Sequence, residues 1–130
     1  ILGDGECHEG QVWEAAMFAT KYRLDNLIAI VDYNKFCLDG PTADVKPIEP
    51  FADKWKAFGW WAIEIDGHNL GEIVRTLDLT ARLYGDGRPK CIIAHTVKGH
   101  GVSIWEHLHT HVGKGDEIAE GVKEGRAKYG

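Results

Sequence analysis

Several features that mark other protein classes are missing from this 130-residue sequence. The 15 lysines and arginines are outnumbered by 20 aspartates and glutamates and form no cluster, which argues against a nucleic-acid surface. No apolar run approaches the roughly 20 residues of a membrane span, and no signal peptide is recognisable. Three cysteines without a CxxC pair suit no disulfide framework, so we expect reduced thiols and a cytoplasmic location.

An initiating methionine is also absent, because residue 1 is isoleucine and lies inside what reads as a buried strand. Proteins rarely begin in the middle of a strand. We therefore expect this chain to be a fragment, or one piece of a longer protein. Its length suits a single domain with a core that buries roughly two-thirds of the unfolded surface.

Apolar runs that alternate with amphipathic stretches predict an α/β fold with a mainly parallel sheet and helices on both faces. The predicted strands are 1–2, 27–31, 60–65 and 91–96, and the predicted helices are 9–23, 51–58, 70–84 and 116–128. The continuous apolar run 27–31 is typical of a parallel strand that is buried on both faces. Glycine and proline predict loops over 36–50 and 99–115.

Polar residues follow the predicted strands at their carboxyl ends, where ligands collect in sheets of this kind. They are Asp4, Asn34, Asp66 and Lys98. Asp4 offers an anionic oxygen and Asn34 a neutral one, and the glycines that flank Asp4 let the backbone approach a phosphate closely. The pattern suits a divalent cation that holds a diphosphate.

The motif and its surroundings resemble the transketolase family. Gly3-Asp4-Gly5, followed after 28 residues by Asn34, is similar to the thiamine-diphosphate motif. The stretches 3–16, 27–40 and 96–103 look like transketolases, in particular the amino-terminal subunit of split transketolases. The resemblance implies that residues 1–130 are the diphosphate-binding domain of an enzyme that moves a two-carbon ketol unit between sugar phosphates.

The resemblance also implies roles for single residues. Asp4 and Asn34 match the family's side-chain ligands to Mg²⁺ or Ca²⁺, and Phe36 matches the residue that adds its backbone carbonyl. Gly5 and Glu6 lie where backbone N–H groups of the family meet the diphosphate. The predicted helix that starts near residue 9 would point its positive end toward that phosphate.

Two further residues have competing explanations. Glu9 matches a glutamate at the family's dimer interface that helps to link the two active sites, but a carboxylate in a first helical turn also stabilises the helix dipole. His111 matches the histidine of the family's Trp-His-Gly motif, which helps to bind cofactor or substrate, only after a one-residue shift. With His107 and His109 it could instead mimic a three-histidine zinc site, although surface histidines are the simpler interpretation.

His68, in an Asp-Gly-His-Asn turn similar to one of the family, is either a turn histidine beside the helix cap Asn69 or a residue at the edge of the site. Lys98 and His100 fall in a segment that is either a solvated loop or the margin of the same site. Of the five tryptophans, Trp13 and Trp55 lie in predicted helices and Trp60 and Trp61 in a predicted strand, and this scatter predicts core and interface packing.

The resemblance implies a missing part as well. In this family the cofactor is activated by a glutamate of a pyrimidine-binding domain, and this chain contains no such domain. We therefore expect the partner to be a pyrimidine-binding domain or subunit, in a homodimer or heterotetramer. Two alternatives stay open. One is another thiamine-diphosphate enzyme, such as a deoxyxylulose-phosphate synthase or a 2-oxo acid dehydrogenase or decarboxylase subunit; the other is a non-catalytic partner subunit.

Overall fold

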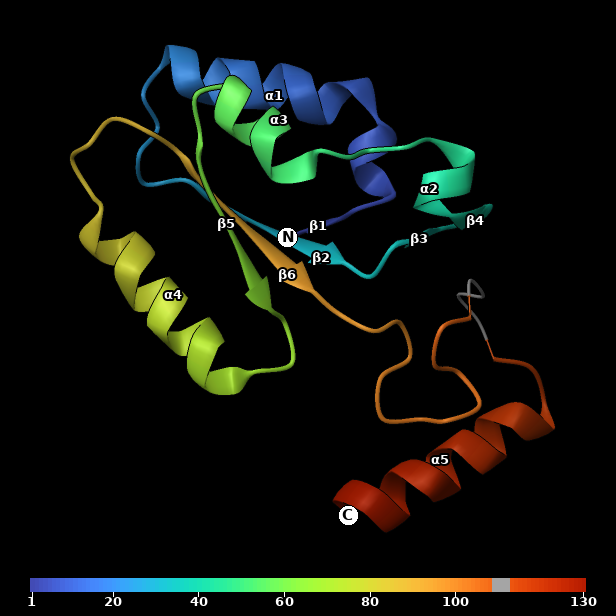
Figure 1. The fold of residues 1–130 in the computed structure, drawn as a ribbon. Helices are drawn as coiled ribbons and strands as arrows, with labels where there is room; N and C mark the ends of the chain where they lie inside the picture. Colours follow the sequence, from blue (N-terminus) through green and yellow to red (C-terminus); the bar gives the residue numbers. More distant parts are fainter. Residues whose placement is uncertain (109–112) are drawn as a thin grey trace.

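The computed structural model describes residues 1–108 and 113–130, and its centre is a four-stranded sheet in which every neighbouring pair is parallel (Figure 1). Across the sheet the strands are β1 (Leu2–Gly3), β2 (Ile28–Tyr33), β6 (Lys90–His95) and β5 (Trp61–Asp66). The helices are η1 (Glu6–His8), α1 (Gly10–Lys21), α2 (Thr42–Val45), α3 (Phe51–Ala57), α4 (Leu70–Arg82) and α5 (Asp116–Tyr129). The predicted α/β class with a parallel sheet is confirmed.

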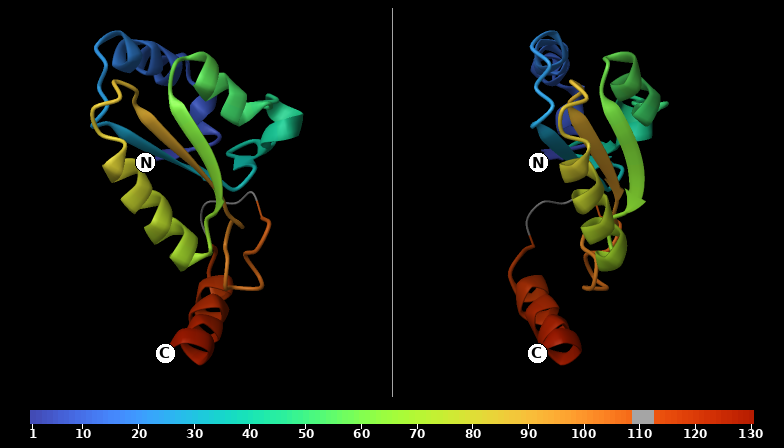
Figure 2. Two further views of the ribbon diagram at one scale, coloured as in Figure 1. Left: turned by 60° about the vertical axis from the view of Figure 1, so that its left-hand side comes forward. Right: turned by 90° about the vertical axis from the view of Figure 1, so that its left-hand side faces the viewer.

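Alternate strand residues face two different helical layers, as the period of two in a strand requires. Val31 and Ile93 belong to the core that α1 and α3 complete, whereas Ile92 and Ile65 pack toward Ile73 of α4 on the opposite face. Figure 1 shows α1 and α3 side by side, with α4 across the sheet from them. Helix α5 lies apart from the sheet in both views of Figure 2.

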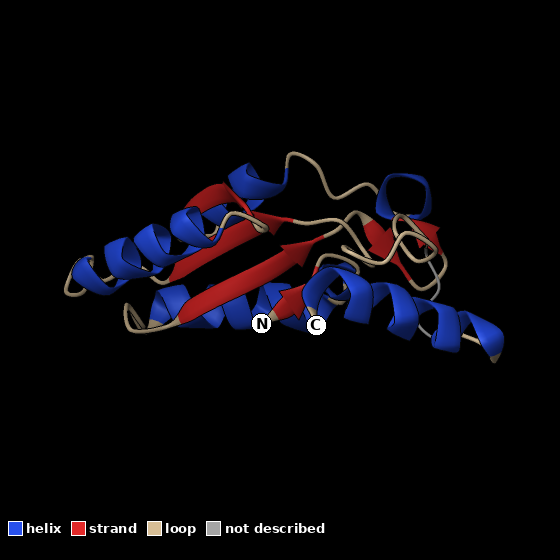
Figure 3. Cartoon of the chain, turned by 90° about the horizontal axis from the view of Figure 1, so that it is seen from below, coloured by secondary structure: helices blue, strands red, loops and turns tan. Residues whose placement is uncertain are grey.

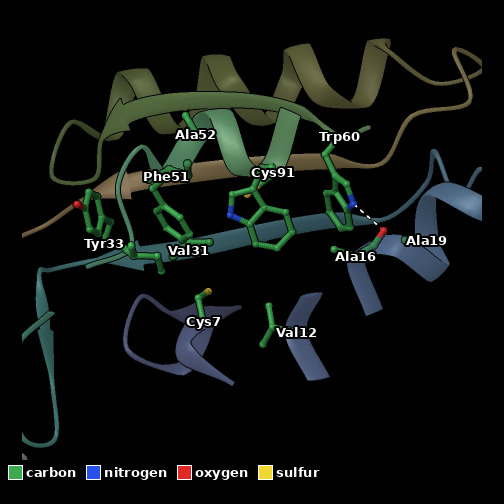
Figure 4. Packing of buried hydrophobic residues seen from close by; sticks show 13 residues of the cluster. Cys7, Val12, Ala16, Ala19, Val31, Tyr33, Phe51, Ala52, Trp60 and Cys91 are labelled. Carbon is green, nitrogen blue, oxygen red and sulfur yellow. Dashed lines mark hydrogen bonds between the residues drawn. The ribbon is translucent and has the colours of Figure 1, made fainter. Parts of the chain in front are cut away.

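The core on the α1 and α3 side is rich in aromatic rings (Figure 4). Trp55 and Phe51 are 1% and 2% exposed, and the Trp55 and Trp60 rings meet edge to face with centroids 4.9 Å apart. The Trp60 indole N–H donates to the Ala16 carbonyl at 3.0 Å, which ties α1 to the start of β5. These contacts confirm core packing for Trp55 and Trp60, while interface packing by the tryptophans stays a prediction.

One sequence prediction needs correction. The predicted loop 36–50 contains a small antiparallel hairpin, formed by β3 (Phe36–Cys37) and β4 (Gly40–Pro41), and then α2. Gly40, with φ of 142°, permits the tight turn, but strands of two residues carry no periodic signal. Helix α1 begins one residue later and ends two residues earlier than the predicted helix 9–23. The buried face of α1 is formed by Val12, Ala16 and Ala19.

The remaining elements lie within about two residues of their predicted bounds, and the segments 99–108 and 113–115 are turns and irregular backbone as predicted. Figure 3 shows the strands of the main sheet running in one direction, so that their carboxyl ends meet at one edge of that sheet. Among the described residues, no helix is both long enough and apolar enough to cross a membrane.

Candidate functional site

A cleft of about 700 Å³ opens at the carboxyl edge of the sheet, where β1 and β2 end side by side. The turn after β1, the end of β2, the β3–β4 hairpin and the segment after β6 all contribute to its lining. The residues predicted from sequence that line it are Asp4, Gly5, Glu6, Glu9, Asn34, Phe36 and Lys98. Residues that are up to 94 positions apart in the chain (Asp4 and Lys98) therefore meet in one place.

Asp4 lies at the base of this cleft with its side chain completely buried. One carboxylate oxygen accepts the Gly5 N–H at 2.9 Å and the other accepts the Lys35 N–H at 2.7 Å. Burial raises the pKa of the Asp4 carboxyl, and the neighbouring Asp32 charge adds to this, while the two N–H groups oppose it. A cation beside Asp4 would offset the cost of burying this charge.

The turn after β2 carries the two further oxygens that the resemblance implies as metal ligands. The Asn34 side-chain oxygen accepts the Phe36 N–H at 3.0 Å, and its amide nitrogen donates to Asp32 at 3.1 Å. Between them Lys35 has a φ of 71°, a left-handed conformation that is uncommon for a side chain of this size. This bend directs the Lys35 N–H to Asp4, so the end of β2 is fastened to the turn after β1.

Gly5 is the position at which the two turns come closest. A Cβ atom on Gly5 would lie 2.6 Å from the Cβ and 3.0 Å from the Cα of Cys37, and 3.6 Å from the carbonyl oxygen of Phe36. A side chain therefore has no room there, and the Phe36 carbonyl faces the turn that holds Asp4. Gly3 differs, since a Cβ at that position would meet nothing nearer than 4.0 Å.

Asp4, Asn34 and Phe36 thus place a carboxylate, an amide and a carbonyl oxygen around one part of the cleft. All three are hard oxygen ligands of the kind that Mg²⁺ and Ca²⁺ prefer. The carboxylate has acceptor capacity beyond the two N–H groups that it binds. The chemistry of these residues therefore fits the metal ion that the resemblance implies.

The segment after Gly5 begins with η1, which was not predicted, and continues into α1 with Glu9 at its N-cap. The Trp13 indole N–H donates to the Cys7 carbonyl at 2.9 Å and holds η1 against α1. The Cys7 thiol is 1% exposed, and its burial, with the nearby Glu6 and Asp4 charges, raises its pKa to about 12. Cys7 is therefore a buried packing residue.

The histidines fall into separate groups. His68 and His100 stack with ring centroids 3.8 Å apart, next to the segment that carries Lys98. His109 and His111 lie outside the described residues, so neither the His111 assignment nor the three-histidine alternative is tested. Within residues 1–108 and 113–130, no group of three or more histidine, cysteine, aspartate or glutamate side chains is arranged to hold a metal ion.

Sequence reasoning missed some residues of the cleft. Asp32 lines it and accepts hydrogen bonds from Asn34 and from the Thr96 hydroxyl. Its position two residues before Asn34, on the same side of an extended strand, was a usable signal. Asp39 and Lys46 also line the cleft, but they reach it through the β3–β4 hairpin and α2, which the sequence pattern did not reveal.

Comparison with known proteins gives a consistent result. The family model described as "Transketolase, thiamine diphosphate binding domain" matches residues 1–130. Over 106 residues the chain is 53% identical to a 6-deoxy-6-sulfo-D-fructose transketolase subunit of a Clostridium strain, covering 82% of this chain and 38% of that subunit. It is 39% identical over 127 residues to an apulose-4-phosphate transketolase subunit of Phocaeicola vulgatus, which covers 95% of this chain and 44% of that subunit.

Among solved structures, transketolase from Campylobacter jejuni superposes with a TM-score of 0.80 at 29% sequence identity. That superposition covers 96% of this chain and 20% of the Campylobacter chain. The chain thus spans less than half the length of the curated subunits described above.

Proposed function

This chain belongs to the transketolase family, and from that premise we propose that it is the diphosphate-binding domain of an enzyme that transfers a two-carbon ketol unit between sugar phosphates. One observation carries the proposal: Asp4, Asn34 and the Phe36 carbonyl gather in a single cleft at the carboxyl edge of the sheet. The sulfosugar and apulose-phosphate relatives are named for different sugars, so the proposal specifies the class of substrate and no individual sugar.

In this proposal the chain holds one end of thiamine diphosphate. Asp4 and Asn34 would bind Mg²⁺ (or Ca²⁺) through side-chain oxygens, and Phe36 through its carbonyl. The backbone of Gly5 and Glu6, at the start of η1, would meet the diphosphate, because a turn without side-chain bulk at Gly5 allows close approach. The bound cofactor supplies the carbanion chemistry that breaks and forms C–C bonds.

The charge of the cleft supports the proposal that a metal ion takes part in binding. Five carboxylates line the cleft, those of Asp4, Glu6, Glu9, Asp32 and Asp39. Among the described residues, only two lysines line it, Lys46 and Lys98. A diphosphate would be repelled by such a surface. A divalent cation between Asp4 and the phosphates converts that repulsion into attraction.

The proposal also covers how the enzyme is assembled. Glu9 is exposed at the margin of the cleft, where it would take part in the link between two active sites at a protomer interface. A pyrimidine-binding domain or subunit would provide the glutamate that activates the cofactor, in a homodimer or heterotetramer. Three cysteines that are all free support a reducing compartment, and we place the enzyme in the cytoplasm.

The test is the affinity of the complete enzyme for thiamine diphosphate in the presence of Mg²⁺, measured by calorimetry. We expect Asp4→Ala to abolish metal-dependent binding. Asp39→Ala is the matched control, since it removes a carboxylate from the same cleft without touching the proposed ligands. Because Asp39 only repels the phosphates, its loss should leave the affinity unchanged or slightly higher. Unchanged affinity in Asp4→Ala would overturn the site assignment.

A further inference from the structure

His68 lies outside the proposed ligand set, yet the turn that carries it packs directly on the strand end beside the cleft. This turn joins β5 to α4. The Gly67 N–H donates to the His95 carbonyl at 2.8 Å, and a Cβ on Gly67 would lie only 2.5 Å from the Thr96 methyl group. The backbone of the turn is therefore in contact with the end of β6, which brings His68 within reach of the segment that follows.

The His68 imidazole has one defined hydrogen bond. Its Nε2 atom lies 2.8 Å from the backbone nitrogen of Val97. A backbone N–H can only donate, so Nε2 accepts through its lone pair and carries no proton. The ring also stacks on His100 at 3.8 Å with an interplanar angle of 28°. A neutral imidazole is thus part of the observed arrangement.

The segment 96–100 that His68 holds leads into the cleft. The Thr96 hydroxyl donates to Asp32, which fixes one end of the segment to the site, and Lys98 lines the cleft itself. His68 fixes the backbone between these two residues. Without it, the peptide at Val97 would lose its acceptor, and the position of the Lys98 ammonium would no longer be set.

We propose that His68 is a positioning residue that, as a neutral imidazole, holds the segment 96–100 so that Lys98 stays in the lining of the cleft, where its ammonium would meet the phosphates. The inference rests on the proposed function. Its consequence is a pH dependence: a proton on Nε2 would face the Val97 N–H, two donors would oppose each other, and the segment would be released.

Other charged groups lie near His68, and their effects on cofactor binding must be distinguished from the effect of the His68 ring. Asp66 accepts the His68 backbone N–H at 2.9 Å, and Glu72 of α4 reaches the Asp66 N–H at 3.4 Å. On the other side, Glu106 lies 3.6 Å from His100. These carboxylates persist in a variant at position 68, so comparing variants isolates the contribution of the His68 ring.

Two variants in the complete enzyme test the role. His68→Gln keeps a side-chain acceptor that never titrates, and His68→Ala removes the acceptor. At pH 7.5 with Mg²⁺, we expect His68→Ala to raise the thiamine diphosphate dissociation constant by roughly fivefold to tenfold, the value of one hydrogen bond, and His68→Gln to stay near wild type. Asn69→Ala is the control, because it weakens the same turn without touching Val97.

The pH dependence of cofactor affinity distinguishes a positioning role of His68 from a general contribution to the stability of the fold. Wild-type affinity should fall on acidification more steeply than that of His68→Gln, because a proton on the His68 Nε2 atom would remove its acceptor, whereas the glutamine acceptor does not titrate. Identical profiles for these two proteins, or a wild-type dissociation constant for His68→Ala, would overturn the role of His68. Absence of cofactor binding in the wild-type enzyme would instead count against the proposed function, and the positioning role with it.

Discussion

Replacing Gly5 with alanine is expected to weaken cofactor binding through its effect on the neighbouring hairpin. The new methyl group would lie 2.6 Å from the Cβ of Cys37, about 0.8 Å inside an ordinary contact of roughly 3.4 Å or more. The clash involves backbone as well, because the Cys37 Cα is 3.0 Å away. The turn 36–37 must therefore move, and the Phe36 carbonyl moves with it.

The size of the effect follows from the cost of overpacking. Inserting a methyl group into a packed site costs about 1–3 kcal/mol. Without cofactor, the exposed hairpin relaxes and the fold loses little stability. Binding requires the Phe36 carbonyl to return to the metal, so the strain opposes binding. A loss of about 1–3 kcal/mol corresponds to a roughly fivefold to 150-fold higher dissociation constant.

The assay is calorimetric titration of the complete enzyme with thiamine diphosphate and Mg²⁺, together with urea unfolding of the free protein. Gly10→Ala is the control, because a Cβ there meets no atom within 4 Å. Adding Cys37→Gly to Gly5→Ala removes the 2.6 Å contact and should restore part of the affinity. If Gly5→Ala bound like wild type, or if Cys37→Gly gave no rescue, the reasoning about the paired turns would be refuted.

Two further predictions concern stability. The Asn69 side-chain oxygen accepts the Glu72 N–H at 3.1 Å and caps α4. Asn69→Ala removes this cap, so urea unfolding should show a free energy of unfolding that is lower by about 1 kcal/mol. An unchanged free energy of unfolding would contradict the capping role. Asp86 hydrogen-bonds and pairs with buried Lys90, which lowers the pKa of the Asp86 carboxyl from 3.8 to about 2. The stabilisation is complete above the unfolded pKa and is lost as the pH falls toward 2. The difference in the free energy of unfolding between wild type and Asp86→Asn should therefore become smaller as the pH falls from 5 to 2. A difference that does not change with pH would contradict a contribution of the Asp86–Lys90 pair to stability.

The sequence predicted the parts of the fold that have a strong local pattern. The apolar run that became β2 and the helix that Asn69 caps lie close to their expected positions. The convergence of Asp4 with Asn34 was also predictable, because parallel strands end at one edge and each residue follows such a strand. Local periodicity and one topological rule were sufficient for this much of the site.

What the sequence did not reveal depends on contacts between distant segments. The β3–β4 hairpin consists of two-residue strands, which have no measurable period, so Asp39 and Lys46 were not placed in the cleft. The short helix η1 is held by the Trp13 indole on the Cys7 carbonyl, a contact that spacing alone does not indicate. His68 reached Val97 only because Gly67 allows the two turns to touch.

The central claim is that the chain binds the diphosphate end of the cofactor through a divalent cation on Asp4, Asn34 and Phe36. The most direct measurement compares the affinity of the complete enzyme for thiamine diphosphate and for thiamine monophosphate, each with Mg²⁺ and with a chelator. We predict tight binding only for the diphosphate with Mg²⁺, with a large loss when either the second phosphate or the metal is removed. Equal affinity in the chelator, or equal affinity for the monophosphate, would contradict the account.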